Sequence, residues 1–434
     1  MNYQQTIDYL IGQLPMYQRT GKAAYKEGLE NTFKLDAYFD SPHKKYITIH
    51  VGGTNGKGSV CHMLASVLQS AGYKVGLHTS PHLVDFRERI RVNGEMMDKQ
   101  AVVDFTRNHK DFFNKVQPSF FEMSVFMAFD YFAKQKVDIG IIEVGLGGRL
   151  DSTNIIRPVL SVITNISMDH TEFLGDTLEK IAAEKAGIIK DKTPVIIGEA
   201  IEKTRPVFER TARTHHAKII FAKEEYQAEY GMLNMHGRQI VQVSDKKENS
   251  GFSVETDLLG FYQRKNLVTS LAVLKELTTN GIHISSDHIK TGLKNVKKIT
   301  GLRGRWDICQ QNPLLICDTA HNAGGIAEVI RQIAETPFRK LHMIIGFVTD
   351  KDMDTILSLM PKDAWYYFTR PSVPRGLDHK QLATAAEKHG LKGEAFSSVA
   401  GALTEAGRKA LKDDLIFIGG STFLVADFLE QEII

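Results

Sequence analysis

A glycine-rich loop joins a predicted strand to a predicted helix near the beginning of the chain. Residues 52–59 read GGTNGKGS and stand between the β-branched run 46–51 and the helix-like stretch 59–71. A strand, a glycine turn and a helix in this order form the first half of a βαβ unit, in which strands run parallel and helices cover the sheet. The loop therefore constrains this part of the chain to an α/β fold.

The residue types in this loop suit a phosphate group. Glycines let successive backbone N–H groups turn toward phosphate oxygens, and the helix N-terminus adds partial positive charge. Lys57 can reach the outer phosphates, and the Ser59 hydroxyl can bind Mg²⁺. The spacing departs from GxxxxGK[ST], because Val51 replaces the first glycine and Gly58 separates Lys57 from Ser59. A glycine turn that merely caps a helix is the alternative, but it needs neither the lysine nor the serine. The loop predicts binding of a nucleoside triphosphate and indicates no particular reaction.

The alternation of strands and helices continues along the chain. The apolar runs 138–144 and 158–165 fit parallel strands that are buried on both faces. Helical patterns are predicted at 100–116, 120–135, 178–188, 264–277 and 286–296. The polar, alternating residues 221–260 predict short antiparallel strands, either at a sheet edge or in a separate β subdomain.

A linker is predicted at residues 299–305 (ITGLRGR), which hold two glycines, two arginines and no apolar period. After it the alternation restarts, with strands predicted at 314–317, 341–345, 364–369 and 414–418 and helices at 323–335, 379–389, 399–411 and 422–429. The predicted fold class is α/β in two domains. A larger, P-loop-type doubly wound domain spans 1–298, a hinge spans 299–305, and a smaller C-terminal α/β (Rossmann-like) domain spans 306–434.

Composition excludes several classes of protein. The chain has 434 residues, 24% of them charged, and a net charge of +3, too balanced to predict a nucleic-acid surface. No apolar run approaches the roughly 18 residues of a membrane helix, and the first twenty residues lack the pattern of a signal peptide. Three cysteines cannot form a disulfide framework. We expect a cytoplasmic protein with reduced thiols.

Two polar residues follow predicted strands in the first domain. Ser80 lies in TSPHL, just past a strand and ahead of RERI, although a Ser-Pro turn alone explains the serine equally well. Glu143 lies inside the apolar run IGIIEVGLGG, where an unpaired carboxylate is costly. Mg²⁺ prefers carboxylate, hydroxyl and water oxygens, so a metal is the simplest partner for Glu143.

Two further candidates carry nitrogen. His170, in NISMDHT, could bind a metal, but a lone histidine is more often a packed or capping residue and Mg²⁺ rarely binds imidazole. Lys185, in AEKAGI, lies on an apolar helix and needs a depressed pKa or a partner. An uncharged amine could react with CO₂ to give a metal-binding carbamate. The alternative is a salt bridge to Glu184 or another acid.

The predicted second domain places polar residues at its strand ends. They lie in the segments RWD, DTAHNAGG and GFVTDKD. Asp318 and His321 are three residues apart, so both can project into one crevice. Each alone is a weak signal, because an aspartate after a strand often caps the next helix.

Taken in order, these segments resemble the folylpolyglutamate synthase and dihydrofolate synthase family of the Mur ligase superfamily. The matching motifs are GTNGKGS, SPHL with RERI, EVGLGGRLDSTN, DHT, AEKAGI, GRWD, DTAHN and GFVTDKD, spread from about residue 7 to 429. Mur ligases share the phosphate loop and the lysine, but EVGLGGRLDSTN is specific to this family. Three positions depart from the family's usual residues, namely Tyr262, Thr319 and Phe423.

The resemblance implies an ATP-dependent amide ligase. The carboxylate of a pteroate or folate would attack the γ-phosphate and become an acyl phosphate, which the amine of L-glutamate would then displace. Phosphorylation supplies the leaving group that a carboxylate lacks, and two domains closing on a crevice would exclude water.

The resemblance also implies roles for particular residues. ATP would be held by Gly53, Thr54, Asn55, Gly56, Lys57, Gly58, Ser59, Asn266, Arg305 and Asp318. Two Mg²⁺ ions would be bound by Ser59, Ser80, Glu143, His170 and a carbamylated Lys185. Residues implied in catalysis are Lys57, Lys185, His170, Asp318 and His321. Substrates would contact Tyr17, Ser80, His82, Arg149, His321 and Ser421, with Arg375 a weaker candidate for a glutamate carboxylate.

Alternatives remain open at this point. The chain could carry both synthase activities, folylpolyglutamate synthesis alone, or the activity of a sister Mur-type ligase. In another class, it could be a nucleotide-gated binding protein that ligates nothing, although such a switch needs neither Asp318 nor His321. The expected partners are ATP, L-glutamate and dihydropteroate or a reduced folate, with no nucleic acid, no membrane and a monomeric chain.

Overall fold

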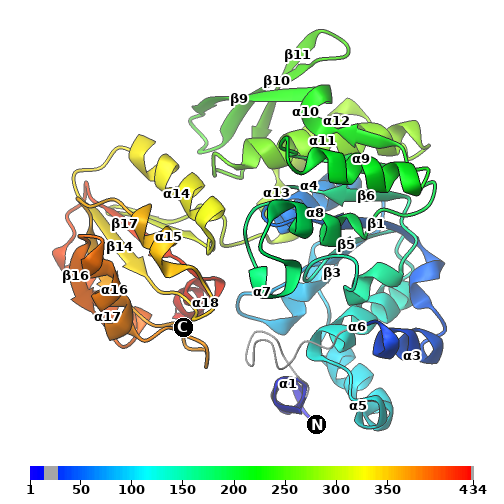
Figure 1. The fold of residues 1–434 in the computed structure, drawn as a ribbon, viewed down its shortest axis with the longest axis horizontal. Coiled ribbons are helices and arrows are strands. Elements are labelled where there is room, and N and C mark those ends of the chain that lie inside the picture. The colour runs from blue at the N-terminus through cyan, green and yellow to red at the C-terminus, as the bar shows by residue number, and fades with distance from the viewer. Residues whose placement is uncertain (14–27, 432–434) are drawn as a thin grey trace.

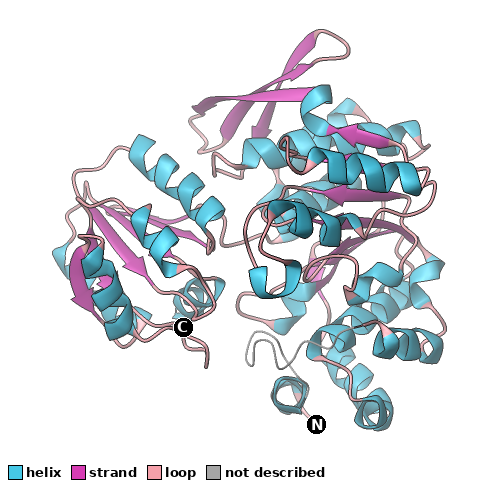
Figure 2. Cartoon of the chain, viewed as in Figure 1, coloured by secondary structure: helices cyan, strands magenta, loops and turns pink. Residues whose placement is uncertain are grey.

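An eight-stranded sheet forms the centre of the N-terminal part of the chain. The computed structural model describes residues 1–13 and 28–431 (Figures 1 and 2). The strand order is β4-β3-β2-β5-β1-β6-β7-β8, in which β2, β5, β1, β6, β7 and β8 run parallel. The bounds are β1 (Ile47–Gly52), β2 (Val75–His78), β3 (Ile90–Val92), β4 (Glu95–Met96), β5 (Ile139–Glu143), β6 (Leu160–Ile163), β7 (Val195–Ile197) and β8 (Ile219–Phe221). The predicted parallel sheet is confirmed.

The register of the central strands brings three strand ends together. Val51 of β1 pairs with Glu143 of β5, and Gly52 pairs with Ile163 of β6. Every residue of β5 and β6 is buried, which explains why both appear in the sequence as continuous apolar runs. The carboxyl ends of β5, β1 and β6 therefore lie side by side at one edge of the sheet.

Helices cover both faces of this sheet (Figure 1). On one face lie α4 (Lys57–Ser70), α11 (Gln263–Thr279), α12 (Ser286–Lys294) and α13 (Val296–Thr300), which share a core with β1, β2 and β5. A second core contains α1 (Tyr3–Gln13), α3 (Glu30–Tyr38), α5 (Lys99–Val116) and α6 (Phe120–Gln135). A third contains α8 (Leu178–Ala186) and α9 (Arg205–Thr214), and the short helices α7 (Thr171–Leu174) and α10 (Ala222–Glu225) lie nearby.

The polar region after β8 forms a sheet of its own. Its strands β9 (Tyr226–Leu233), β10 (Gln239–Asp245) and β11 (Ser250–Thr256) are antiparallel, in the order β11-β10-β9. Val241, Val243 and Val254 of this sheet are buried in the core shared with α4 and α11. Of the two arrangements left open by the sequence, the separate β subdomain is the one observed.

The connection between the two halves begins later than expected. The predicted helix 286–296 is broken at Asn295, and α13 continues through Ile299 and Thr300, the first two residues of the predicted linker. Thr300 is fully buried, and its hydroxyl lies 2.8 Å from Nδ1 of His62 on α4. Gly301, with a φ of 69°, ends α13 in the left-handed conformation that suits glycine.

A six-stranded sheet organises the C-terminal part. Its order is β12-β13-β17-β14-β15-β16, with β12 antiparallel to its neighbour and the remaining pairs parallel. The strands are β12 (Asp307–Gln311), β13 (Leu314–Asp318), β14 (Leu341–Ile345), β15 (Trp365–Phe368), β16 (Lys392–Ala395) and β17 (Leu415–Gly419). The helices are α14 (Ala323–Glu335), α15 (Met353–Ser358), α16 (His379–Lys388), α17 (Val399–Lys409) and α18 (Thr422–Gln431). Cores on both faces of this sheet confirm the predicted second α/β region.

Some short elements were not predicted. β16 is exposed at all four residues and carries no apolar pattern, and β7 and β8 have only three residues each. No helix in residues 1–13 and 28–431 is long and apolar enough to span a membrane.

Candidate active site

The glycine loop is fastened to the end of β6. Thr54 N–H donates to the Asn165 backbone oxygen at 2.9 Å, and Asn55 N–H donates to the Asn165 side-chain oxygen at 2.8 Å. Gly53 has a φ of 136°, and a Cβ there would lie 1.9 Å from the Thr164 hydroxyl oxygen. Only glycine fits at this position, so the backbone curve predicted from the sequence is imposed by packing.

Two lysines converge on the oxygen side of this loop. Lys57, the first residue of α4, donates from Nζ to the carbonyl oxygens of Gly53 and Thr54 at 3.2 and 3.1 Å. Lys185, which is 5% exposed, donates from Nζ to the same Gly53 oxygen at 2.8 Å. Burial, reinforced by the positive charge of Lys57, lowers the pKa of the Lys185 amine to about 7.

The salt bridge considered for Lys185 is not formed with Glu184. Glu184 instead accepts from Nε and from the second terminal nitrogen of Arg149, at 3.0 and 2.9 Å. The Arg149 side chain is 56% exposed and does not line the cavity described below. Its expected substrate contact therefore has no support from the position of the side chain.

Glu143 lies beneath the loop at the end of β5. It is 3% exposed, and its Oε2 accepts from the backbone N–H of Ser80 at 2.9 Å. A Cβ on Gly58 would stand 3.8 Å from both of its carboxylate oxygens, so the start of α4 faces this group. Burial raises the pKa of Glu143, and the positive charge of Lys57 opposes that rise. The carboxylate is thus buried and faces the start of the phosphate-binding helix.

A metal at this point fits a mixed set of ligands. No three His, Cys, Asp or Glu side chains among the described residues cluster closely enough to hold an ion. Carboxylate and hydroxyl oxygens come from Glu143, Ser59 and Ser80, and Ser59 Oγ already accepts from Gln263 Nε2 at 3.2 Å. Such hard oxygen donors match the preference of Mg²⁺, which keeps several waters and needs few protein ligands.

His170 stands at the start of α7 with a φ of 50°. Its side chain forms no helix-capping hydrogen bond, so the capping alternative is wrong. Burial lowers the pKa of His170 to about 4, which leaves the imidazole neutral at physiological pH. A neutral ring nitrogen facing the cavity is the form that can bind a metal.

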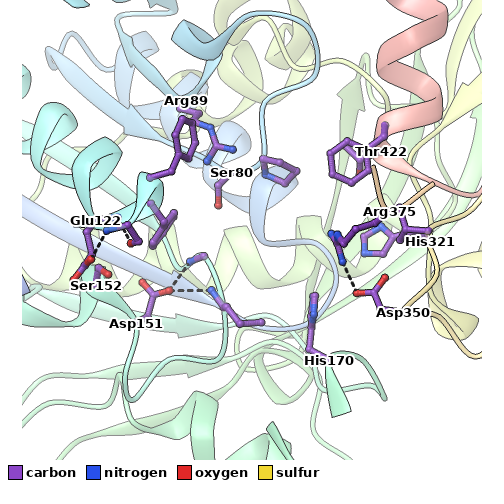
Figure 3. A pocket seen from close by; sticks show the side chains of 18 of the residues that line it. Ser80, Arg89, Glu122, Asp151, Ser152, His170, His321, Asp350, Arg375 and Thr422 are labelled. Atoms are coloured by element: carbon purple, nitrogen blue, oxygen red, sulfur yellow. Dashed lines mark hydrogen bonds and ion pairs between the residues drawn. The ribbon is translucent and has the colours of Figure 1, made fainter. Parts of the chain in front are cut away.

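A cavity of about 240 Å³ opens between the two α/β parts (Figure 3). It includes five residues expected from the sequence, namely Ser80, His170, His321, Arg375 and Ser421. The cavity is also lined by Gly28, Pro81, Arg89, Ser119, Phe120, Phe121, Glu122, Gly145, Leu146, Leu150, Asp151, Ser152, Val348, Asp350, Lys351, Thr422 and Phe423. Figure 3 shows Ser80, Arg89 and Asp151 on the side of the first part and Arg375, His321 and Asp350 opposite them.

Two other expected substrate residues do not line this cavity. His82 lies behind Arg89, whose Nε donates to His82 Nδ1 at 2.7 Å, so the histidine fixes the arginine that does line it. Tyr17 lies outside the described residues. The RERI motif alone does not indicate which of its residues faces the cavity, so Arg89 was not predicted as a lining residue.

Asp151 is another lining residue that sequence reasoning did not single out. Its Oδ2 accepts from the backbone N–H groups of Gly145 and Leu146 at 3.0 and 2.9 Å, and its Oδ1 accepts from Thr153 N–H at 2.9 Å. These hydrogen bonds to the carboxylate hold the glycine-rich segment after β5 in place around it. The signal lay in the DSTN part of the family motif, where only the glycines and Glu143 had been interpreted.

Residues of α11 and the second part meet beside the loop. Asn266 packs against Gly56, because a Cβ on that glycine would lie 2.2 Å from Asn266 Oδ1. The Tyr262 hydroxyl donates to Asp318 Oδ2 at 2.5 Å, and the same oxygen accepts from Trp306 N–H at 2.8 Å. Burial raises the pKa of Asp318, and the positive charge of Arg305 opposes that rise.

Asp318 is not a helix cap, so the alternative given for it is wrong. Asn322 caps α14 by accepting from Gly325 N–H at 2.9 Å. His321 Nδ1 donates to the Thr319 carbonyl oxygen at 2.9 Å, which turns the other ring nitrogen toward the first part. Asp169 and Lys351 lie beside these residues, and the sequence motifs that contain them do not distinguish either one as a functional candidate.

Comparisons with known proteins agree with this arrangement. Residues 51–274 match the Mur ligase middle domain, and residues 304–422 match the Mur ligase glutamate ligase domain. The dihydrofolate synthase/folylpolyglutamate synthase of Bacillus subtilis is 35% identical over 406 residues, covering 89% of each protein. The chain spans about half the length of two relatives from Haloferax volcanii and Halobacterium salinarum.

Solved structures resemble the whole chain. E. coli FolC in complex with DHPP and ADP has a TM-score of 0.86 and 28% identity, covering 100% of this chain and 98% of that one. The Yersinia pestis bifunctional folylpolyglutamate synthase/dihydrofolate synthase, complexed with AMPPNP and a Mn ion, has a TM-score of 0.84 and 26% identity, covering 100% and 98%.

Proposed function

Because the chain belongs to the Mur ligase family, and within it to the dihydrofolate synthase/folylpolyglutamate synthase group, we propose that it is an ATP-dependent amide ligase. It joins L-glutamate to the carboxylate of a pteroate or folate, and it carries both synthase activities. The observation that carries this proposal is the shared cavity, in which acidic, cationic and hydroxyl groups from both α/β parts face one space.

The nucleotide is assigned to the glycine loop and its neighbours. Residues 53–59 bind the phosphates through the N–H groups of the loop other than those of Thr54 and Asn55, which donate to Asn165. Lys57 binds them as well, and its Nζ now donates to carbonyl oxygens of the loop. Asn266, Arg305 and Asp318 contact the rest of the nucleotide. The positions of Asn266 against Gly56 and of Asp318 beside Tyr262 support this assignment.

The metal site is assigned to Ser59, Ser80, Glu143 and His170, with two Mg²⁺ ions. When bound, Mg²⁺ neutralises phosphate charge as the phosphoryl group is transferred. Glu143 supports this assignment because it is buried, accepts a hydrogen bond from Ser80 N–H and faces the start of α4. The protein's part is to hold these four side chains in position.

We also propose that Lys185 is carbamylated. A pKa of about 7 leaves roughly half of this amine uncharged at neutral pH. An uncharged amine reacts with CO₂ to form a nitrogen–carbon bond and releases one proton, which converts a cation into a carboxylate-like anion. That change would turn the like-charge contact with Lys57 into an attraction.

The acceptor is assigned to the aromatic side of the cavity. Phe120 and Phe121 offer apolar faces for a flat ring system, while Asp151 and Arg89 offer polar groups at its edge. L-glutamate is assigned to the opposite side, where His321, Ser421 and Arg375 line the space together with Lys351. The two substrates then meet beside Ser80 and the phosphate loop.

The reaction follows from these positions. The acceptor carboxylate attacks the γ-phosphate and breaks its bond to the β-phosphate oxygen, giving an acyl phosphate and ADP. The glutamate amine attacks the acyl carbon, the carbon–oxygen bond to phosphate breaks, and the amine loses a proton. Lys57 and the loop N–H groups stabilise the charge that develops on the phosphoryl oxygens. The cavity is lined from both α/β parts of the chain, and we propose a monomer as the active unit.

Product analysis tests the proposal. The protein is incubated with ATP, Mg²⁺ and L-glutamate, and with dihydropteroate in one reaction and tetrahydrofolate in another. We expect a glutamate adduct in both reactions, with ADP and phosphate released in step. An adduct with tetrahydrofolate alone would indicate a folylpolyglutamate synthase only. ATP turnover that is independent of glutamate and of either acceptor would refute the ligase and favour a nucleotide-gated switch.

A further inference from the structure

One buried carboxylate joins the two α/β parts at the site. Asp169, on the loop after β6, accepts at Oδ1 from Lys351 Nζ at 2.8 Å and at Oδ2 from Asn322 Nδ2 at 3.0 Å. His321 Nε2 lies 3.7 Å from the same Oδ2. These three partners belong to the second part, where His321 and Asn322 precede α14 and Lys351 precedes α15. From the first part, His170 Nε2 lies 3.8 Å from Asp169 Oδ2.

We propose that Asp169 is a positioning residue, which assembles the amino-acid side of the site by holding His321, Asn322 and Lys351 against the first part. The role rests on the proposed function, because it concerns the side of the cavity assigned to L-glutamate. Asp169 does not line the cavity itself. It acts through residues that do, since His321 and Lys351 both face that space.

Burial makes this contact more than a surface ion pair. The side chains of Asp169 and Lys351 are 7% and 9% exposed, so both charges have lost most of their water. In such surroundings each charge needs its partner, whereas an exposed pair contributes little. The carboxylate is also held from its own side, because His170 N–H donates to Oδ1 at 3.0 Å.

Asn322 extends the contact to the phosphate loop. One of its N–H groups reaches Asp169, and Nδ2 also donates to Asn55 Oδ1 at 3.0 Å. Asn55 Nδ2 donates back to Asn322 Oδ1 at 3.2 Å. The side-chain amide of Asn322 therefore bonds both to the nucleotide loop, at Asn55, and to Asp169. A nucleotide that orders Asn55 would fix Asn322, and Asp169 would fix His321 and Lys351 in the same arrangement.

The structure provides a matched control for this contact. Lys265 of α11 and Glu328 of α14 form a second Lys–carboxylate pair between the two parts, at 2.9 Å. That pair is more exposed, at 42% and 21%, and neither residue lines the cavity. Glu328→Gln removes an interdomain charge pair of nearly the same length without touching the site.

The experiment compares Asp169→Asn with Glu328→Gln in the full chain. Steady-state kinetics give kcat and KM for L-glutamate, KM for ATP and the Mg²⁺ concentration for half-maximal rate. For Asp169→Asn we expect the glutamate KM to rise at least tenfold and kcat to fall. ATP KM and the Mg²⁺ requirement should stay within threefold. Glu328→Gln should stay within twofold in every parameter.

Small-angle scattering without substrates adds a readout that does not depend on activity. Asp169→Asn should have a larger radius of gyration than the wild type, and Glu328→Gln should not. Asp169→Glu keeps the charge and should recover part of the glutamate KM. If Asp169→Asn fails to fold, the Asp169→Glu variant decides, because a positioning carboxylate moved by one methylene must still raise the glutamate KM above the wild type.

Three results would overturn the proposal. The first is an Asp169→Asn variant that matches Glu328→Gln in kinetics and scattering. The second is an Asp169→Asn variant in which chiefly the Mg²⁺ requirement changes, which would mean that Asp169 acts through His170. An unchanged glutamate KM in a folded Asp169→Glu variant is the third. Failure of the proposed function is a separate outcome, seen as a wild-type protein that forms no glutamate adduct.

Discussion

Replacing Gly58 with alanine separates metal binding from folding. Gly58 is the second residue of α4, and its φ is not in the left-handed region. Among the residues that the structure describes, and outside its own helix and neighbours, a Cβ would approach only the two Glu143 carboxylate oxygens within 4 Å, each at 3.8 Å. That is ordinary van der Waals contact. The new methyl group therefore enters the space between Glu143 and the start of the phosphate-binding helix without a clash.

The expected magnitudes differ for stability and activity. In a helix interior alanine is about 0.5–1 kcal/mol more favourable than glycine, and less so in the first turn. We therefore expect Gly58→Ala to be as stable as the wild type or slightly more so. A Mg²⁺–oxygen bond is about 2.1 Å long, so the waters and phosphate oxygens around an ion on Glu143 extend into the space that the methyl group takes. We expect the Mg²⁺ requirement to rise at least tenfold, equivalent to about 1.4 kcal/mol.

The assay measures glutamate-dependent ADP release against Mg²⁺ concentration, alongside urea unfolding. Gly407→Ala in α17 is the control, because a Cβ there meets no atom of the described residues within 4 Å. It should be at least as stable as Gly58→Ala and keep the wild-type Mg²⁺ requirement. A folded Gly58→Ala variant with an unchanged Mg²⁺ requirement would refute the reasoning, since Glu143 would then not hold the ion on this side.

Three further predictions concern single groups. Tyr262→Phe removes the hydroxyl that donates to buried Asp318. Because a hydrogen bond to a charged group contributes about 1.5 kcal/mol, the ATP KM should rise about tenfold. An unchanged ATP KM would contradict an ATP contact at Asp318. Lys185→Ala should be inactive and partly restored by added short carboxylates, while a folded variant without rescue would count against the carbamate. Burial alone would raise the pKa of the Asp85 carboxyl, but hydrogen bonds from Arg87 and Tyr3 lower it to about 2. Because that is below the unfolded value, Asp85 stabilises the fold above about pH 4 and loses this contribution, at most about 2 kcal/mol, as pH falls toward 2. In Asp85→Asn the urea unfolding midpoint should depend less on pH between pH 5 and 2 than in the wild type. The same pH dependence in both proteins would contradict a stabilising role for the Asp85 carboxylate.

Local sequence patterns were enough to predict the secondary-structure elements that position the site. The strand, glycine loop and helix around Lys57 follow from β-branched residues, glycines and an apolar period that lie within thirty residues of one another. Glu143 and Lys185 were identifiable because an ionisable group in an apolar run must have a reason to be there. In both cases the cost of burying charge is visible in the sequence, whatever the tertiary structure.

Side-chain direction was not predictable in the same way. Arg149 and His82 belong to specific motifs, yet one pairs with Glu184 on α8 and the other lies behind Arg89. These outcomes depend on which surfaces pack together. The extension of α13 into the predicted linker was not predicted for a related reason. Its last residue, Thr300, is buried against His62, which is far away in the sequence. The residue pattern of the segment alone does not indicate this contact.

Asp169 shows why an interdomain contact escapes sequence reasoning while a metal ligand does not. Its neighbour His170 was identified as a candidate from residue type alone, but a carboxylate after a strand has many possible roles. What distinguishes Asp169 is that Lys351 and Asn322 arrive from two loops of another sheet. Glu143 and Lys185 are ionisable groups buried within one domain, and their burial points to ligands. Asp169 accepts one hydrogen bond from its own part, but its contacts with Lys351 and Asn322 form only when the domains meet. Its charge therefore stabilises that arrangement and links it to the amino-acid side of the cavity.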